Sequence, residues 1–218
     1  MRKHPILPVT EAFQYRAIGV VRGTYTPDSE DHFTRGNLID LDGESIQSVV
    51  LGRLLTLMHR HIDLSLPHLW VVYPRCRDAD TLHLQIAGIW EPSTLDLSPS
   101  NKISPSDSNN PSQKFLDKLP EGDDYFSVRG ELIYTKPENN ELILKIRQKQ
   151  KFTTKKVTPF KLKLMGKVSK DNLKHFISLD VRRKGQRLCV EDSKSIGPIP
   201  NRGIKPKGRL QSMKRKQP

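Results

Sequence analysis

The sequence predicts a mostly β protein made of two small five-stranded barrels, with one short helix in the first barrel. Segments rich in β-branched and aromatic residues recur in two blocks, and a stretch rich in Ser, Pro and Asn separates the blocks. Hydrophobic residues make up 35% of the 218 residues, which is low for a single compact core. We therefore expect barrels over residues 1–92 and 123–195, a disordered linker over 93–122 and a disordered basic tail over 196–218.

The first block contains five predicted strands, at residues 13–25, 33–41, 45–50, 69–73 and 82–90. In the first of them, Gly19 and Gly23 are expected to mark bulges, and a turn is expected at residues 26–28. Apolar residues with the i, i+3, i+4, i+7 spacing predict an amphipathic helix over residues 51–61. The resulting order of three strands, a helix and two strands is that of the OB-fold, a five-stranded Greek-key barrel.

The second block opens with residues 125–136, which contain a glycine at position 130. When Gly130 is aligned with Gly19, Phe126 lies opposite Tyr15, and this short internal repeat favours a second barrel of the same type. Four more strands are predicted, at residues 141–149, 160–168, 175–182 and 187–191. Because no helix pattern interrupts them, we expect a second OB-like barrel that is poor in helix.

Positive charge is confined to the second part of the chain. Residues 1–92 hold 9 basic and 11 acidic residues, a net charge of −2, and residues 93–122 hold 3 and 4, a net charge of −1. Residues 123–195 hold 18 and 9, a net charge of +9, and residues 196–218 hold 7 and 0, a net charge of +7. The formal charge of +13 therefore indicates a polyanionic partner for the second barrel and the tail, with nucleic acid as the first candidate.

Strand alternation predicts a basic face on the second barrel. In residues 141–149 and 160–165, apolar side chains alternate with basic ones. The basic side chains expected on this face are Lys145, Arg147, Lys149, Lys161 and Lys163. Like charges on facing strands destabilise a sheet, so the pattern favours a surface that a bound polyanion neutralises. The alternative is a solvated face whose lysines protect edge strands from pairing.

Two further basic segments extend the predicted binding site. A loop after the second strand of this barrel carries Lys149, Lys151, Lys155 and Lys156. Phe152 lies within this loop and is the aromatic residue best placed to stack on a base. The tail contains Lys214, Arg215 and Lys216, and such a polycation raises the association rate and affinity for a polyanion.

The nearly neutral first barrel offers a secondary set of candidates. Arg and aromatic residues lie on or beside its first two strands, near the usual ligand side of an OB-fold. The secondary binding candidates are Arg16, Arg22, Tyr25, Phe33 and Arg35. Mixtures of arginine and aromatic side chains bind single strands, but a neutral barrel is equally suited to dock a protein partner.

Catalytic, metal and membrane signals are weak in this sequence. The two cysteines, Cys76 and Cys189, form no CxxC pair, and His59 and His61 do not share a helix face, so neither a metal nor a cofactor is expected. A nuclease would need clustered carboxylates or histidines in a basic groove, and the acidic residues of the second block are scattered. No apolar run is long enough to span a membrane, which favours a cytoplasmic protein with no membrane partner.

Three runs carry a resemblance to known proteins: GVVRGTYTP at 19–27, HIDLSLPHLWVVYPR at 61–75 and LHLQIAGIWEPS at 82–93. They resemble a family of cyanobacterial proteins, which are similar in strand order to OB-fold proteins that bind single-stranded nucleic acid. The resemblance covers the first 93 residues and implies a cytoplasmic protein of cyanobacterial type. No functional residue is carried over from it. Housekeeping bacterial single-strand-binding proteins end in an acidic tip, whereas this chain ends in a basic tail, which leaves RNA as a ligand.

These observations predict a non-catalytic protein that binds single-stranded nucleic acid, with RNA preferred over DNA. The basic strand face, the basic loop and the tail are expected to contact phosphates. The alternative function is an adaptor whose first barrel docks a protein and whose basic barrel binds a ribonucleoprotein such as the ribosome. A contiguous exposed apolar patch on the first barrel would favour that alternative.

Overall fold

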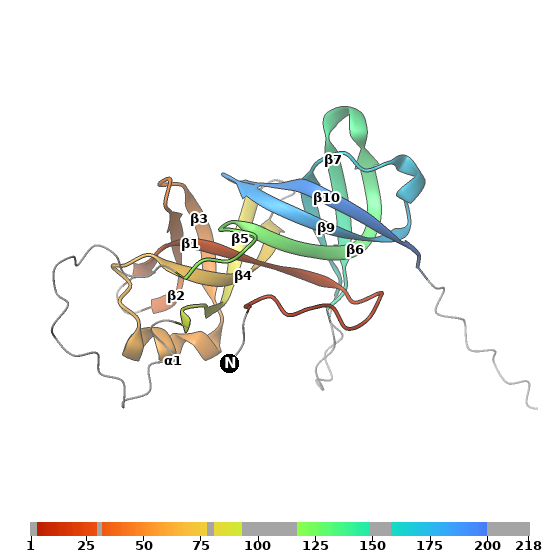
Figure 1. Cartoon of the computed structure of the whole chain (residues 1–218). Helices are drawn as coiled ribbons and strands as arrows, with labels where there is room; N and C mark the ends of the chain where they lie inside the picture. Colours follow the sequence, from red (N-terminus) through yellow and green to blue (C-terminus); the bar gives the residue numbers. More distant parts are fainter. Residues whose placement is uncertain (1–3, 30–31, 78–80, 93–116, 149–157, 200–218) are drawn as a thin grey trace, which may run out of the picture.

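A computed structural model of the chain describes residues 4–29, 32–77, 81–92, 117–148 and 158–199 (Figure 1). The strands of the first barrel are β1 (Arg16–Ser29), β2 (His32–Asp40), β3 (Ser45–Val50), β4 (His68–Arg77) and β5 (Thr81–Ile89), with helix α1 (Gly52–His61) between β3 and β4. Those of the second are β6 (Tyr125–Lys136), β7 (Glu141–Ile146), β8 (Phe160–Met165), β9 (His175–Lys184) and β10 (Arg187–Pro198). Short 3₁₀ helices, η1 (Pro137–Asn139) and η2 (Lys170–Asn172), follow β6 and β8.

Both halves of the chain close into the barrel that the sequence predicts. In the first, β1 pairs with both β2 and β4, and β3 pairs in parallel with β5. In the second, β6 pairs with both β7 and β9, and β8 pairs in parallel with β10. The five strands of each barrel, taken in chain order, pair in the same way. Each barrel therefore has the connectivity of an OB-fold. Helix α1 buries Leu54 and Met58 against the first barrel, as its spacing predicts.

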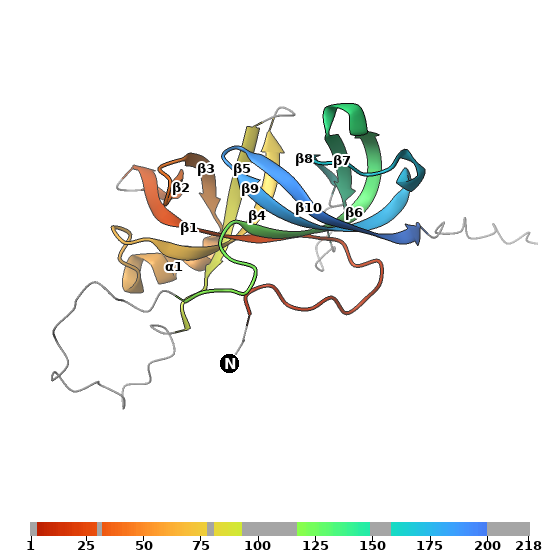
Figure 2. The same ribbon diagram turned by 45° about the horizontal axis from the view of Figure 1, so that its top comes forward.

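The two barrels share one sheet. The start of β1 pairs antiparallel with the start of β6, from Arg16 opposite Arg129 to Gly19 opposite Phe126. All ten strands therefore belong to a single hydrogen-bonded sheet, and Figure 2 shows β1 and β6 running side by side between the barrels. Strand pairing between the blocks is not predicted by any local pattern, because both partners are ordinary β-forming segments.

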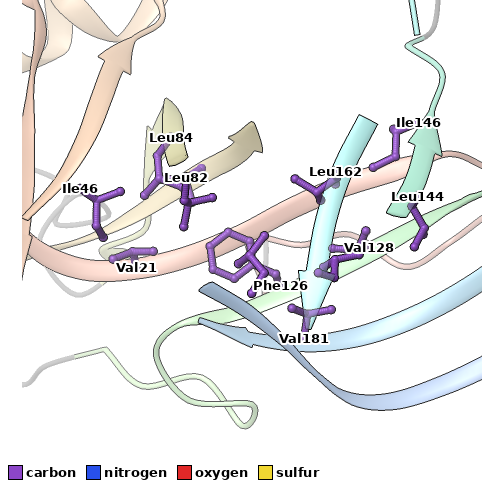
Figure 3. Packing of buried hydrophobic residues seen from close by; sticks show 14 of the residues in the cluster. Val21, Ile46, Leu82, Leu84, Phe126, Val128, Leu144, Ile146, Leu162 and Val181 are labelled. Atoms are coloured by element: carbon purple, nitrogen blue, oxygen red, sulfur yellow. The ribbon is translucent and has the colours of Figure 1, made fainter. Parts of the chain in front are cut away.

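A glycine makes this pairing possible. A Cβ on Gly19 would lie 2.2 Å from the Phe126 ring, so only a glycine leaves room for that side chain. Phe126 is fully buried, and it lies between Val21 and Leu82 of the first barrel and Leu162 and Val181 of the second (Figure 3). The hydrophobic cores of the barrels are thereby continuous, forming one cluster of buried side chains.

The internal repeat is real, but its predicted alignment is wrong by four residues. Gly130 corresponds to Gly23, not to Gly19. The first strand of each barrel exchanges one neighbour for the next here, β1 at Gly23 and β6 at Glu131, the residue after Gly130. A Cβ at Gly23 or Gly130 would meet a facing carbonyl oxygen, that of Ile39 at 2.2 Å or of Lys145 at 2.8 Å. The shared tripeptide Val-Arg-Gly at 21–23 and 128–130 marks this equivalence in the sequence.

The paired arginines of this tripeptide hold the barrels together reciprocally. Arg22 donates to the Asp123 carboxylate at 2.7 Å and to the Asp117 carbonyl at 2.5 Å, in the segment that leads into the second barrel. Arg129 donates to the Ala12 carbonyl at 2.7 Å, in the segment that leads into the first. The residues before β1 thus run along the second barrel, as Figure 1 shows.

Other differences from the sequence expectations lie at the ends of elements. Residues 26–28, expected as a turn, continue β1, with a register shift between Pro27 and Ser29. β10 continues through Pro198, three residues into the segment expected to be a disordered tail. Residues 93–116 of the expected linker lie outside the described residues, but Leu119 is buried against Val20 and Leu69 on the outside of the first barrel.

Candidate nucleic-acid interface

The basic side chains of β7 and β8 lie on the outer side of the second barrel. Leu142, Leu144, Ile146, Leu162 and Leu164 are buried in the barrel core, as alternation predicts. The basic side chains of both strands therefore point outward. In the β7–β8 pair, Lys145 lies directly opposite Lys161, and Lys163 lies opposite Ile143. These two strands are the second and third of their barrel, which form the usual ligand face of an OB-fold.

Acidic residues neutralise part of this face. Glu131 of β6 lies opposite Lys145, and its carboxylate is 3.7 Å from the Lys145 ammonium and 3.6 Å from the Arg147 guanidinium. The Glu141 carboxylate is 3.2 Å from the Lys163 ammonium. Sequence reasoning missed these pairs because each joins residues of different strands. Lys161 is exposed and has no ion pair among the described residues, and Lys145 and Arg147 share one carboxylate, so this face keeps an excess of positive charge.

A groove of about 870 Å³ between the barrels adjoins this face. Three arginines from different elements line it: Arg16 of β1, Arg75 of β4 and Arg147, which follows β7. The Arg75 guanidinium lies over the Phe160 ring, 3.9 Å from its centroid, and the Arg147 guanidinium is 5.7 Å from the centroid of Tyr15. The groove therefore combines positive charge with aromatic surface, the two properties of a protein surface that bind single-stranded nucleic acid.

Burial disfavours the charged form of two arginines that line the groove. Desolvation lowers the pKa of Arg16 and of Arg75, because a buried cation is costly. Arg16 donates to the Leu7 carbonyl at 2.5 Å and Arg75 to the Pro74 carbonyl at 2.9 Å. In the described part of the chain neither arginine has a carboxylate partner, so both keep an attraction for an incoming anion.

Two of the secondary candidates on the first barrel are not available to a ligand. Tyr25 is 1% exposed within the core, and its hydroxyl donates to the Phe33 carbonyl at 3.0 Å. Burial, followed by the nearby charge of Asp28, raises the pKa of Tyr25 to about 12. Arg22 is 5% exposed and is covered by the segment around Asp123. Neither side chain is therefore open to a ligand in this structure.

The other secondary candidates occupy three separate places. Arg16 lines the groove between the barrels. Phe33 packs edge-on against His59 of α1, with ring centroids 4.2 Å apart. Arg35 is exposed on β2. The structure therefore brings only Arg16 together with residues of the basic face.

Several predicted binding residues lie outside the described residues. They are Lys149, Lys151, Phe152, Lys155 and Lys156 of the basic loop, and Lys214, Arg215 and Lys216 of the tail. Gln148, the last described residue before the loop, and Phe160, two residues after the described chain resumes at Thr158, both line the groove. Sequence reasoning did not single out Arg75 or Tyr73 of β4, which line the same groove, because nothing local relates β4 to the second barrel.

Two other classes of site find no support in the described residues. No group of three or more His, Cys, Asp or Glu side chains there could hold a metal ion. No helix in the described segments has the length and apolar character that crossing a membrane requires.

Comparison with known proteins agrees with the two-barrel architecture. Residues 17–97 match the family model described as the N-terminal OB-fold domain of PatR RNA-binding protein. Residues 128–197 match the family model described as the C-terminal cyanobacterial OB-fold-like RNA-binding domain. The two matches follow each other in the order of the two barrels. No curated protein matches the chain.

Proposed function

Because the chain belongs to the cyanobacterial family of OB-fold RNA-binding proteins described by these two domain models, we propose that it binds single-stranded RNA along the outer face of β7 and β8, without catalysis. The observation that carries this proposal is the placement of Lys145 directly opposite Lys161 on the two strands that form the usual ligand face of an OB-fold. Like charges directly opposite each other on facing strands repel, and an RNA phosphate bound at this position would reduce that repulsion.

The ion pairs on this face leave it able to bind phosphate. The Glu131 contacts with Lys145 and Arg147 span 3.6–3.7 Å between side chains that are partly exposed. Pairs of this kind contribute about 0–1 kcal/mol, so a phosphate can compete with the carboxylate for either cation. The glutamates also space the positive charge into separate positions, which suits the regularly spaced phosphates of a single strand better than a compact anion.

The choice of RNA over DNA rests on the family description, and backbone charge alone does not distinguish the two. Discrimination requires contacts to the ribose 2′-hydroxyl. The basic loop with Phe152 and the tail with Lys214, Arg215 and Lys216 belong to the proposed site as sequence predictions. They would add phosphate contacts to those of the β7–β8 face.

The adaptor alternative gains no comparable support. Among the described residues 16–92, Leu41 at the β2–β3 hairpin is the one large apolar side chain that is exposed. The other exposed apolar residues of this half, Leu7, Val9 and Phe13, precede β1. A docking surface on the first barrel would need a contiguous apolar patch of several such side chains.

Charge reversal tests the proposed face. The double variant Lys145→Glu/Lys161→Glu should bind a fluorescein-labelled 12-nucleotide oligo-U RNA at least about tenfold more weakly than the wild type in fluorescence anisotropy at 0.1 M salt. The control is Lys118→Glu/Lys194→Glu, which makes the same change in net charge at exposed positions outside β7 and β8. Equal losses in both variants would contradict a site on the β7–β8 face.

A further inference from the structure

The groove between the barrels has an open apolar floor. Ala17 of β1 and Ala87 and Gly88 of β5 line it with little side-chain volume. A Cβ on Gly88 would have the Val71 Cβ, at 3.9 Å, as its one neighbour within 4 Å, so space opens directly above this strand. A register shift in the β4–β5 pair, between Val71 and Val72, occurs at the same place. At about 870 Å³, the groove lies in the range of about 300–1,000 Å³ that holds small ligands.

Planar groups from both barrels form its walls. The Arg75–Phe160 stack joins β4 to β8 across the groove, and Tyr73, two residues before Arg75 on β4, lines it as well. Nucleobases that leave a single strand stack on aromatic rings and on guanidinium planes, and both kinds of surface are present here. A flat apolar molecule without hydrogen-bonding edges would fit less well, because Arg16 and Arg147 also line the groove.

The groove and the basic face share a residue. Arg147 lines the groove and also lies within 3.6 Å of Glu131, which pairs with Lys145 on the basic face. Its Nε atom is shielded from solvent and has no hydrogen-bond partner among the described residues. A strand whose phosphates lie along β7 and β8 therefore passes the mouth of the groove, close to a donor that lacks an acceptor.

We infer that this groove receives an unstacked base of the bound RNA, which stacks against the Arg75–Phe160 pair while Arg147 contacts the adjoining phosphate. This inference rests on the proposed function and adds a base-binding site to it. It assigns part of the affinity to base stacking, in addition to the phosphate contacts of the basic face. It also gives the first barrel a role in binding, through β4 and β5.

Filling the groove tests this site without changing charge. Gly88→Leu places a side chain in the open space, and the matched control is Gly52→Leu, at the start of α1, where a Cβ would meet nothing within 4 Å. We expect Gly88→Leu to weaken binding of oligo-U RNA by about tenfold or more, the size of one lost stacking contact, while the control binds as the wild type does. The salt dependence of the remaining affinity should be unchanged, because no phosphate contact is removed.

A comparison of two ligands separates this inference from the proposed function. The probes are the 12-nucleotide oligo-U RNA and an abasic RNA, a ribose-phosphate backbone of the same length that carries no bases. If the wild type binds neither, the proposed function fails. If it binds both equally, or if Gly88→Leu binds oligo-U as tightly as the wild type, RNA binding stands and the groove site is overturned. A preference for oligo-U that disappears in Gly88→Leu supports the groove site.

Cross-linking gives an independent readout that does not depend on the folding of a variant. Oligo-U that contains 5-iodouridine, irradiated in complex with the wild-type chain, should cross-link to the aromatic residues of the groove. Mass spectrometry should find the modified peptide around Tyr73 or Phe160. Cross-links confined to peptides outside the groove lining would overturn the assignment.

Discussion

Arg183 of β9 forms a buried ion pair with Asp40 of β2, across the boundary between the two barrels. The guanidinium Nη2 and the Asp40 Oδ2 are 2.5 Å apart, and the side chains are 2% and 5% exposed. The same guanidinium donates through Nε to Asp124 at 2.6 Å. Burial by itself raises the pKa of Asp40, but hydrogen bonds from Arg183 and from the backbone of Glu44 and Asp42 outweigh it and hold that pKa low. The barrels are therefore locked together at a second point, beside the end of the β1–β6 pairing at Phe126.

Replacing Arg183 by methionine should destabilise the whole protein. The change leaves the buried Asp40 and the half-buried Asp124 without their cation, and breaking a buried pair such as Arg183–Asp40 costs about 3–5 kcal/mol. Urea denaturation followed by circular dichroism measures the free energy of unfolding. Arg182→Met is the matched control, since Arg182 pairs with Glu191 at the surface and its ion pair contributes about 1 kcal/mol or less. Similar losses of unfolding free energy in the two variants would contradict a stabilising role for the buried Arg183–Asp40 ion pair.

Gly19→Ala should also be destabilising. The added Cβ would overlap the Phe126 ring at 2.2 Å, and overpacking of this kind costs about 1–3 kcal/mol. Gly88→Ala serves as the control, because its Cβ would have only an ordinary contact at 3.9 Å. Adding Phe126→Leu to Gly19→Ala should restore part of the loss, which thermal denaturation would detect as non-additive effects. Additive effects would mean that the two residues do not compete for space.

Stability should depend on the protonation of His68. Its Nε2 faces the Asp63 carbonyl at 2.7 Å and its Nδ1 faces the Glu91 carboxylate, so both ring nitrogens are placed to donate. Burial lowers the pKa of His68, but the contacts with Glu91 and Asp63 outweigh it, so the folded-state pKa is raised. The stabilisation of the folded state by protonated His68 is fully present below the unfolded pKa of about 6.5. It is lost as the pH rises through the folded pKa.

His68→Gln should therefore cost more free energy of unfolding at pH 5.5 than at pH 9. Urea denaturation at the two pH values measures this difference. Glu91→Gln removes the carboxylate that favours the imidazolium, and it should flatten the same pH dependence. A cost of His68→Gln that is equal at both pH values would contradict a charged His68 in the folded state.

The two barrels should unfold together. Their cores form one cluster and their strands one sheet, so neither barrel keeps its contacts when the other unfolds. The two tryptophans, Trp70 and Trp90, lie in β4 and just after β5, so tryptophan fluorescence reports on the first barrel. The urea transition followed by tryptophan fluorescence should coincide with the transition followed by far-ultraviolet circular dichroism, which reports on both barrels. Two separated transitions would show that the barrels are independent units.

The sequence was sufficient for the strands of each barrel, because alternation and turn signals are local. Alternation also gave the inward side of β7 and β8 correctly, since Leu144 and Leu162 are buried while Lys145 and Lys161 lie between inward-facing residues. It did not give the exposure of the side chains on β1, where five consecutive residues from Gly19 to Gly23 are buried. This strand is covered on its outer side by Leu119, so period-two alternation no longer distinguishes an exposed residue from a buried one.

The groove could not be predicted from the sequence at all. Its arginines come from β1, from β4 and from the end of β7, and they meet because β1 pairs with β6. That pairing depends on the fit of Gly19 to Phe126, a contact between residues more than a hundred positions apart. Local patterns carry no information on such a contact. The tripeptide shared at 21–23 and 128–130 is the one signal that could have given the correct register of the repeat.

The most direct test of the RNA-binding face is the salt dependence of RNA affinity in the wild type and in Lys145→Gln/Lys161→Gln. For single strands, the slope of log K against log salt is about −0.7 for each phosphate contact. If both lysines contact phosphate, the variant should show a slope shallower by about 1.4, together with weaker binding of oligo-U. An unchanged slope would mean that the β7–β8 face does not contact the RNA backbone, and the site would have to be sought elsewhere on the protein.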